Sequence, residues 1–401
     1  MNSEDSSDLQ RAVDAQTQIV VGLRAAVFSE TDPTRDERRF LELAVAEDRL
    51  AELQRQRVQA DRRPETSLEL ASARRGALLG EETTGLRVEV RIRMDPVPTG
   101  VYHLLDPATD PLLTVHVENC SRIIRRVCVE ARLDGLSATA ARTIEIAPRK
   151  TAEFDLLPTL FPDRARTIVQ TQRATLDLQV KELGGELERR DTYTITCLAR
   201  SMSFNAARRP DSGEMVDLSH YYGAWVTPHV AAVQKVIRQA CEFAPDHQLP
   251  GYQGDVRCVE QQVAALYRSL QAAQIVYVNS VIDFGAPFGI ATQRTRLPRE
   301  SLGQRSANCI DGTVLLASLM EGISLNPALV LVPGHAFVGW ETWHASGEWR
   351  FLETTMIGTS DFELAHQSGQ RQYEQYTQSR NNRLRRHSLR DLRKRGILPM
   401  E

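Results

Sequence analysis

The spacing of hydrophobic residues divides this sequence into three regions with different expected secondary structure. In residues 1–62, apolar residues recur every three or four positions, which is the period of an amphipathic helix. A polar break at residues 31–35 (TDPTR) separates two such patterns, so we expect an antiparallel helical hairpin. The hairpin either contacts a protein partner or a second copy as a coiled coil does, or packs on its own protein. Residues 63–85 are expected to form a polar linker.

The second region, residues 86–200, alternates apolar and polar residues with a period of two, as half-buried β-strands do. Pro, Gly and Asn residues separate the alternating runs and mark turns. The runs are LRVEVRIRM, LLTVHVEN, RVCVEARLDG, ARTIEIAP, TAEFDLLP, ATLDLQVKE and DTYTITCLAR. About seven short strands of this kind predict an immunoglobulin-like β-sandwich, for which scaffolding is the favoured role. Residues 201–218, rich in Arg, Asn, Pro and Gly, are expected to form a second linker.

The third region, residues 219–401, mixes both periods, so the whole chain is expected to be an α+β protein. Helical spacing follows Thr227-Pro228 and returns over residues 255–273, while QIVYVNS indicates a strand. After an irregular segment rich in Gly and Pro, an apolar helix is expected to begin at Cys309. Three strands follow it (PALVLVP, HAFVGWE and WRFLETT), and then a polar helix over residues 359–379.

The composition indicates a soluble globular protein. Hydrophobic residues make up 42% and charged residues 25% of the chain, and the net charge of −3 gives no overall signal for nucleic-acid binding. The longest apolar runs are too short to span a bilayer, so no membrane contact is expected, and the acidic N-terminus is unlike a secretory signal. The six cysteines form no Cys-x-x-Cys pair, so we expect reduced thiols in the cytoplasm, with no disulfide, metal or other cofactor.

A basic run at residues 380–395 holds seven Arg and one Lys. Clustered positive charge of this kind can bind nucleic acid or an acidic partner. Aromatic residues for base stacking are absent from the run. Nucleic-acid binding is therefore not expected, and a structural element with a solvated basic face is favoured.

Three residue types that nucleophilic catalysis requires occur in order in the third region. Cys309 stands at the start of the apolar helix, His335 opens the second strand 26 residues later, and Glu353 lies near the end of the third strand after another 18 residues. A helix N-terminus carries unpaired N–H groups and partial positive charge, which favour a reactive thiolate. Each residue taken alone is more often structural. The three together, on consecutive elements, favour a catalytic function in which Glu353 orients the imidazole.

The motifs around these residues resemble the transglutaminase-like branch of the papain-like cysteine-enzyme superfamily. The resemblance rests on the CID motif that begins at Cys309, on the leucine-rich helix, and on GHAFVGW and FLETT. YYGAWVTP, GYQ and the closing LRDLRKRGILP extend it to related bacterial proteins. It implies a helix against a small antiparallel sheet, with Cys309 as the nucleophile, His335 as the base and Glu353 in place of the usual Asp.

Four further residues are weaker candidates for this site. Gln304 and Asn308 precede the nucleophile, where the resemblance implies a side-chain amide in the oxyanion hole, although a solvated loop position is the favoured alternative for Gln304. The backbone N–H of Cys309 is another possible oxyanion donor. Trp340 and Trp343 flank the histidine strand and are candidates for the wall of a substrate groove, although a tryptophan near a sheet more often packs in the core.

We therefore expect a cysteine-nucleophile enzyme that transfers acyl groups from a peptide or protein substrate. With water as the acceptor it is a protease or amidase, which is favoured because water needs no second binding site. With a lysine as the acceptor it is a protein-crosslinking transglutaminase. A non-catalytic scaffold that binds peptides is the alternative from another class. The resemblance also fits a bacterial signalling or defence component that a partner activates.

Overall fold

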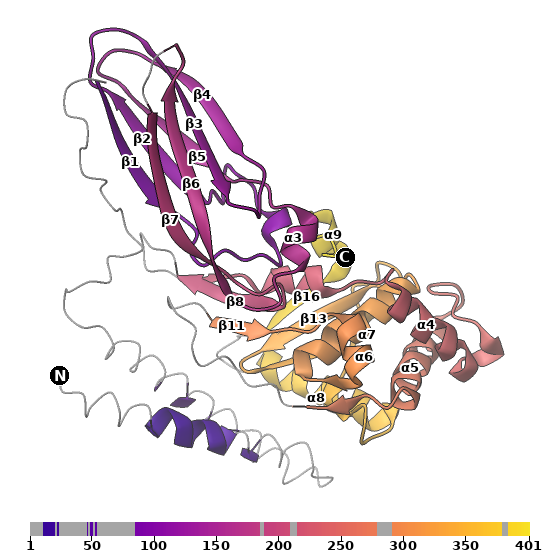
Figure 1. Cartoon of the computed structure of the whole chain (residues 1–401). Coiled ribbons are helices and arrows are strands. Elements are labelled where there is room, and N and C mark those ends of the chain that lie inside the picture. The colour runs from indigo at the N-terminus through magenta and orange to yellow at the C-terminus, as the bar shows by residue number, and fades with distance from the viewer. Residues whose placement is uncertain are drawn as a thin grey trace. The chain divides into compact units, whose positions relative to one another are not determined.

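The computed structural model divides the chain into two units, Met1–Leu68 and Glu69–Glu401, and each is considered by itself (Figure 1). The residues that it describes are 11–20, 22–23, 46, 49–50 and 53 in the first unit, and 85–184, 188–208, 215–278, 291–378 and 384–401 in the second. Helices and sheets both contribute, so the mixed α+β class is confirmed.

In the first unit, residues 11–20 are helical, as their spacing predicts. Val20 is buried and packs with Ala46, which comes from the second helical pattern. The side-chain amide of Gln16 donates a hydrogen bond to the Ala46 carbonyl over 3.0 Å. These contacts join the two patterns of the expected hairpin, whereas its polar break and nearly all of the linker that follows lie outside the described residues.

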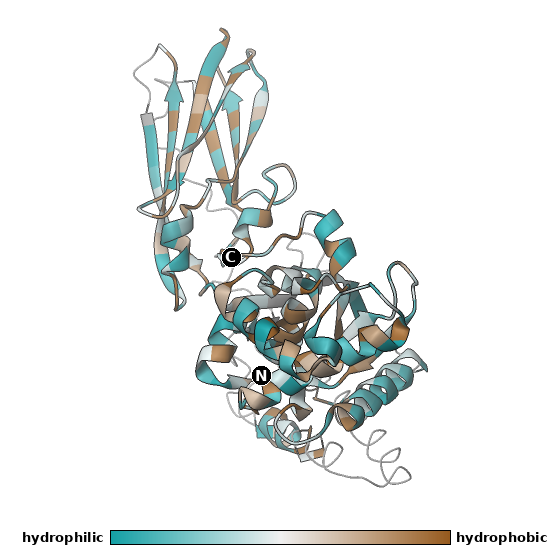
Figure 2. Cartoon of the chain, turned by 90° about the vertical axis from the view of Figure 1, so that its right-hand side faces the viewer, coloured by the Kyte–Doolittle hydropathy of each residue, from teal (hydrophilic) through white to brown (hydrophobic). Residues whose placement is uncertain are grey.

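Two antiparallel sheets that share one hydrophobic core form the region from Leu86 to Cys197. One sheet, in the order β1-β2-β5, contains β1 Leu86–Ile92, β2 Leu113–Asn119 and β5 Thr151–Leu156. The other, in the order β4-β3-β6-β7, contains β3 Arg125–Leu133, β4 Ala140–Ile146, β6 Gln172–Glu182 and β7 Glu188–Cys197. Apolar residues of both sheets meet in the core, and brown and teal bands alternate along the strands in Figure 2. The period of two therefore predicted these strands correctly.

Cys128 and Cys197 lie in β3 and β7, and both are buried, as their positions in the alternating runs indicate. They do not bond to each other, and all six cysteines of the chain are free thiols. Burial raises the pKa of Cys197 to about 11, with the charge of Asp95 as a second cause. The Cys197 thiol is therefore an unreactive part of the core.

The segment from 201 to 218 is not the irregular linker that its composition predicts. Its described residues include two strands, β8 Met202–Arg208 and β9 Met215–Asp217. β8 pairs with β9 and also with β11 Ala291–Arg294, which comes from the segment before the candidate nucleophile. The loop prediction was wrong because antiparallel pairing with a distant segment outweighs the local preference of these residues.

His335, one of the three candidate catalytic residues, lies on a second four-stranded sheet, in the order β15-β14-β13-β16. Its strands, all antiparallel, are β13 Pro327–Val332, β14 His335–Glu341, β15 Trp349–Leu352 and β16 Arg385–Ser388. The helices around it are α4 Ala231–Ala240, α5 Val256–Ala272, α6 Pro298–Gln304, α7 Cys309–Gly322, α8 Phe362–Gln378 and α9 Leu389–Lys394. Within the described parts of the chain, no helix is both long and apolar enough to cross a membrane.

Helix α7 is buried on all sides at the centre of this region. Every residue from 310 to 320 is buried. The helix packs against the face of the sheet that carries Ala336 and Val338 of β14. On the opposite face, the ring of Tyr373 from α8 stacks on Phe351 of β15, with 3.7 Å between the ring centroids. The sheet therefore has α7 on one face and part of α8 on the other.

The basic run contributes β16 and α9 to this region. Among its described residues, Arg390 pairs with Glu341 over 2.8 Å and Arg393 pairs with Glu321 over 2.8 Å. Arg393 also donates hydrogen bonds to the backbone carbonyls of Gly223, Val226 and Ile397. These arginines therefore serve the fold, in agreement with the structural alternative.

Helix α8 approaches the end of β15 at a glycine. A Cβ on Gly369 would lie 2.6–2.8 Å from backbone atoms of Leu352 and Glu353, which is closer than a real contact permits. The N–H of Glu353 donates a hydrogen bond to the carbonyl of Ala365 over 3.0 Å. The absence of a side chain at Gly369 thus lets the helix touch the backbone that carries Glu353.

Replacing Gly369 with alanine should separate α8 from β15 and destabilise the protein. We expect the free energy of unfolding to fall by about 1–3 kcal/mol, because the added methyl group forces the backbone of α8 or of Leu352 and Glu353 to move. Urea denaturation followed by tryptophan fluorescence measures this change. Gly303→Ala in α6 is the matched control, since nothing lies within 4 Å of a Cβ added there and alanine favours a helix. Equal effects of the two substitutions would contradict the close approach.

Candidate active site

Cys309 is the first residue of α7, and a reciprocal cap determines where this helix begins. The side-chain oxygen of Asn308 accepts a hydrogen bond from the N–H of Asp311 over 2.8 Å. The Asp311 carboxylate in turn accepts one from the N–H of Asn308 over 3.2 Å. The Cys309 side chain therefore stands at the helix N-terminus, where the helix dipole favours a thiolate.

A buried ion pair holds the preceding segment against this helix start. The fully buried Asp311 carboxylate accepts hydrogen bonds from the N–H and the guanidinium of Arg296, both over 2.7 Å. Burial raises the pKa of Asp311, and the hydrogen bonds from Arg296 and Asn308 oppose this rise. The sequence gave no sign that Asp311 pairs with Arg296, because the pairing depends on the fold.

A two-residue turn brings His335 to the cysteine. β13 ends at Val332 and β14 begins at His335, and Gly334 between them has a φ of 70°. Glycine adopts this left-handed conformation without strain, so the tight turn is possible. The His335 side chain forms a hydrogen bond with Cys309. Its ring also stacks on Phe337, two residues further along the same strand, with 6.1 Å between the ring centroids.

Glu353 lies on the other side of the His335 ring. Its Oε2 atom is 2.7 Å from His335 Nε2, which leaves Nδ1 for the hydrogen bond with Cys309. The Glu353 side chain is fully buried, and the His335 side chain is 9% exposed. The structure thus brings together the three residues that the sequence singled out.

The Glu353 carboxylate accepts four hydrogen bonds. Besides His335, its Oε2 atom accepts one from the side-chain amide of Gln372 over 2.7 Å. Its Oε1 atom accepts two from Thr355, from the N–H over 2.9 Å and from the hydroxyl over 2.7 Å. These donors compensate for the loss of water around a buried charge. Sequence reasoning missed Gln372 because it lies in a polar helix among several other glutamines.

His335 and Glu353 stabilise each other in their charged forms. Burial lowers the pKa of His335, but the charge of Glu353 and the hydrogen bonds to Cys309 and Glu353 outweigh it and raise the pKa to about 10. Burial raises the pKa of Glu353, and His335 and Thr355 more than reverse this, so that it falls below its usual value. Near neutral pH the pair is an imidazolium and a carboxylate, and the imidazolium is hydrogen-bonded to Cys309.

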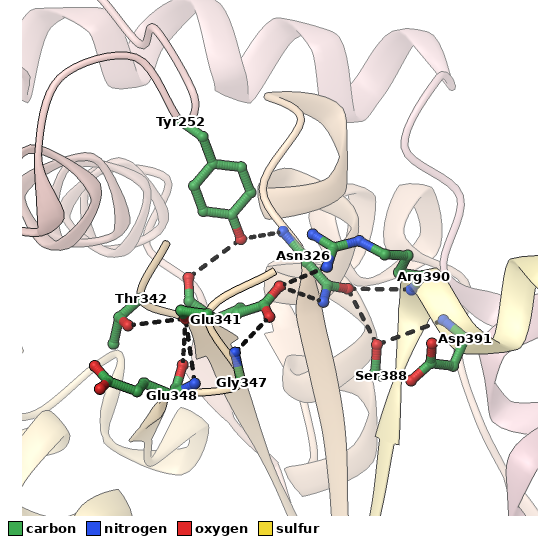
Figure 3. Close-up of polar contacts among 10 residues, drawn as sticks. Tyr252, Asn326, Glu341, Thr342, Gly347, Glu348, Ser388, Arg390 and Asp391 are labelled. Atoms are coloured by element: carbon green, nitrogen blue, oxygen red, sulfur yellow. Dashed lines mark hydrogen bonds and ion pairs between the residues drawn. The ribbon is translucent and has the colours of Figure 1, made fainter. Parts of the chain in front are cut away.

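The acid on β14 itself is Glu341, and it has structural partners of its own (Figure 3). It lies at the opposite end of the strand from His335. Its carboxylate accepts hydrogen bonds from Asn326 over 2.9 Å and from the N–H of Gly347 over 3.0 Å, and it pairs with Arg390 over 2.8 Å. Glu341 therefore joins a strand, a hairpin and a helix, and it does not orient His335.

The two tentative oxyanion residues have other contacts. Gln304 is the exposed last residue of α6, and its side-chain oxygen accepts a hydrogen bond from Arg296 over 2.9 Å. Asn308 is buried, and its side-chain oxygen caps α7. These contacts assign each residue a structural function. An oxyanion role for either side chain stays a prediction.

Trp340 and Trp343 lie toward the end of β14 opposite His335, and a place in the wall of a substrate groove stays a prediction for both. Strands rise about 3.3 Å per residue, so Trp340 is roughly 17 Å along β14 from His335. It is 1% exposed and packs against Phe362 in the core. Trp343 follows the far end of β14 and meets Tyr252 edge-on at 6.0 Å. Core packing, the alternative for a tryptophan near a sheet, describes Trp340.

Tyr222 is a buried neighbour of the thiol that the sequence did not single out. Its hydroxyl forms hydrogen bonds with Ser203 and Thr295. Burial raises the pKa of Tyr222, and the charge of Cys309 adds to this rise, so the phenol lies within electrostatic reach of the sulfur. Its only sequence signal is its place in the YYGAWVTP motif.

Comparison with known proteins adds no assignment. No protein-family model matches the chain, and no curated protein sequence matches it. Across the described residues, no group of three or more His, Cys, Asp or Glu side chains is arranged to hold a metal ion. The geometry and charges of Cys309, His335 and Glu353 are therefore the basis of a functional proposal.

Cys309 should react with iodoacetamide faster than the other five cysteines at neutral pH. The imidazolium of His335 and the helix N-terminus both favour its thiolate, which is the form that reacts. Partial labelling followed by peptide mass spectrometry ranks the six sites in one sample, with the partly buried Cys120 as an internal reference. His335→Gln should slow the labelling of Cys309 alone. Uniform labelling, or Cys309 as the slowest site, would refute an activated thiol.

The His335–Glu353 pair should also make stability depend on pH in a defined direction. Because the folded-state pKa of His335 is raised, its contribution is fully present below its ordinary pKa of 6.5 and is lost as the pH rises through about 10. The lowered pKa of Glu353 makes its contribution present above 4.5 and lost as the pH falls through its folded-state value. His335→Gln should therefore lower Tm most between roughly pH 5 and 6.5, and progressively less toward pH 10.

Differential scanning calorimetry across this pH range measures the difference between the variant and the wild type. His229→Gln is the control, because His229 is exposed and its loss should change Tm little at any pH. A Tm difference for His335→Gln that stays constant up to pH 10 would argue against a buried ion pair.

Proposed function

We propose that this protein is a cysteine-nucleophile enzyme that transfers acyl groups from amide bonds of a peptide or protein substrate. The observation that supports this most is the His335 ring, which forms one hydrogen bond with Cys309 and another with the fully buried Glu353. Burying a carboxylate is costly unless the site compensates for its charge. An orienting acid requires this arrangement, whereas a purely structural histidine does not.

In the proposed reaction, the Cys309 thiolate attacks the carbonyl carbon of the substrate. A C–S bond forms and an electron pair moves to the carbonyl oxygen, which the positive potential at the start of α7 stabilises. Collapse of this intermediate breaks the C–N bond, and the imidazolium of His335 gives its proton to the leaving amine. The neutral imidazole then takes a proton from an attacking water, and the acid leaves as the thiolate is restored.

Hydrolysis is the favoured outcome because water needs no binding site of its own. Transfer to a lysine amine uses the same thioester intermediate, so a protein-crosslinking transglutaminase is the second candidate. The hydrogen bonds that join Cys309, His335 and Glu353 argue against the third, a non-catalytic scaffold that binds peptides.

The family, the β-sandwich, the compartment and the biological context are part of the same proposal. A helix that begins at the cysteine, followed by antiparallel strands, supports the resemblance to the transglutaminase-like branch of the papain-like superfamily. The strand order β1-β2-β5 against β4-β3-β6-β7 supports an immunoglobulin-like sandwich with a scaffolding role. Six free thiols fit a reducing compartment such as the cytoplasm. A bacterial signalling or defence role, with a partner on the N-terminal helices, rests on the resemblance alone.

Turnover of a general protein substrate such as casein by four variants tests this proposal. Cys309→Ala and His335→Ala should retain essentially no activity. Glu353→Gln should be roughly 10²- to 10⁴-fold slower than the wild type, because an orienting acid takes no part in bond making. Glu353→Asp should recover part of this loss, since it keeps the carboxylate one methylene further away. Full activity of Glu353→Gln, with folding checked by circular dichroism, would remove Glu353 from the site.

The same assay decides the acceptor when a fluorescent primary amine is present. Peptide-bond cleavage should exceed amine incorporation, and both should vanish in Cys309→Ala. Incorporation that exceeds cleavage would replace the protease by the transglutaminase, and Cys309-independent cleavage would refute the proposed enzyme.

A further inference from the structure

Gln372 binds the same carboxylate oxygen that holds the candidate catalytic histidine. Its side-chain Nε2 lies 2.7 Å from Glu353 Oε2, and this oxygen is also 2.7 Å from His335 Nε2. The Gln372 residue is 1% exposed. We propose that Gln372 is a positioning residue, whose amide directs Oε2 toward His335 and keeps Glu353 ionised. This inference rests on the proposed function, because it assigns Gln372 a part in the same site.

The stereochemistry of the carboxylate explains why a second donor matters. Each carboxylate oxygen offers about two acceptor positions. Thr355 occupies those of Oε1 with two hydrogen bonds, and His335 and Gln372 share those of Oε2. Rotation of the Glu353 carboxylate would break several of these bonds at once, so it stays aligned with the imidazole.

An amide suits this position better than a charged donor. A neutral N–H stabilises the carboxylate without supplying a proton that could neutralise it. A lysine or arginine there would compete with the imidazolium of His335 for the charge of Glu353. Gln372 therefore lets Glu353 direct its full charge to His335, which favours the imidazolium beside Cys309.

Contacts of helix α8 on both sides of Gln372 fix the position of its side-chain amide. Gly369, one turn before Gln372, lets the helix touch the β15 backbone. Tyr373, the next residue, stacks on Phe351 at 3.7 Å with an interplanar angle of 13°. His366 on the same helix places Nδ1 2.8 Å from the Phe351 carbonyl oxygen. These contacts come from successive turns of α8, so the side chain of Gln372 is held in place before any substrate binds.

A purely structural glutamine makes a different prediction from a positioning residue. If Gln372 only satisfied a buried acid, its substitution would change stability and leave both the rate and the pH dependence of Cys309 alkylation unaltered. Gln372→Glu separates the two roles. At low pH the substituted carboxyl is protonated and can donate its O–H to Glu353, as the amide does. At higher pH it would lose this proton, repel Glu353 and disturb His335, because two adjacent carboxylates cannot both ionise freely.

The experiment is the rate of Cys309 alkylation by iodoacetamide from pH 5 to pH 8, measured by mass spectrometry on the full chain. The rate of Gln372→Glu relative to wild type should fall by about tenfold across this range, which corresponds to a shift of one pKa unit. Gln372→Leu, which has no donor, should be slower by a constant factor at every pH. Gln367→Glu, the same change on the exposed face of α8, should match the wild type throughout.

Parallel profiles for Gln372→Glu and the wild type, in folded protein, would overturn the positioning role. Wild-type rates in Gln372→Leu would do the same. If Gln372→Leu does not fold, Gln372→Asn replaces it, since it keeps the amide but withdraws it by one methylene and should also slow the alkylation. Failure of the proposed function is distinguishable, because it appears as wild-type protein without Cys309-dependent turnover, whereas the alkylation profiles need no substrate.

Discussion

The burial of one carboxylate, that of Glu353, sets the requirements for the rest of the candidate site. A charge removed from water costs several kcal/mol unless a counter-charge and enough hydrogen-bond donors surround it. His335 supplies the counter-charge, while Thr355 and Gln372 supply the remaining donors. These partners come from β14, from the residues after β15 and from α8, so three elements must meet at this point. The close contact at Gly369 and the tight turn at Gly334 are two backbone features that allow them to do so.

The two ends of β14 show what the choice of partner does to a buried acid. At one end Glu341 pairs with Arg390, which never loses its proton under ordinary conditions, so this site only holds elements together. At the other end Glu353 pairs with His335, whose proton can leave in a reaction. Both carboxylates have lowered pKa values despite burial. The same strand thus carries one permanent ion pair and one that can exchange a proton.

Local patterns allowed much of this site to be predicted from the sequence. Cys309, His335 and Glu353 lie on consecutive elements, and a helix followed by antiparallel strands leaves few ways to arrange them. The alternation in β1 to β7 was equally informative, because period two is a local property of half-buried strands. Fold class and candidate residues therefore followed from short-range information.

Contacts between distant segments were not predictable in the same way. The pairing of β8 with β11, the Arg296–Asp311 pair and the Gln372–Glu353 hydrogen bond each join residues whose types have many alternative partners. The partners of Trp340 and Trp343, Phe362 and Tyr252, were equally unpredictable, because both come from distant segments. In each case tertiary structure decided between options that were locally equal.

Because residues 310 to 320 of α7 are buried, Cys309 is held more rigidly than His335 and Glu353. Displacing the backbone of Cys309 would disturb a helix whose residues from 310 to 320 all lie in the core, where packing leaves no room for graded movement. His335 and the segment around Glu353 depend instead on a turn and on hydrogen bonds at the sheet end. The Cys309 sulfur is therefore expected to keep its position. Any adjustment of alignment, whether by an effector or by substitution, is expected on the side of the imidazole and its acid.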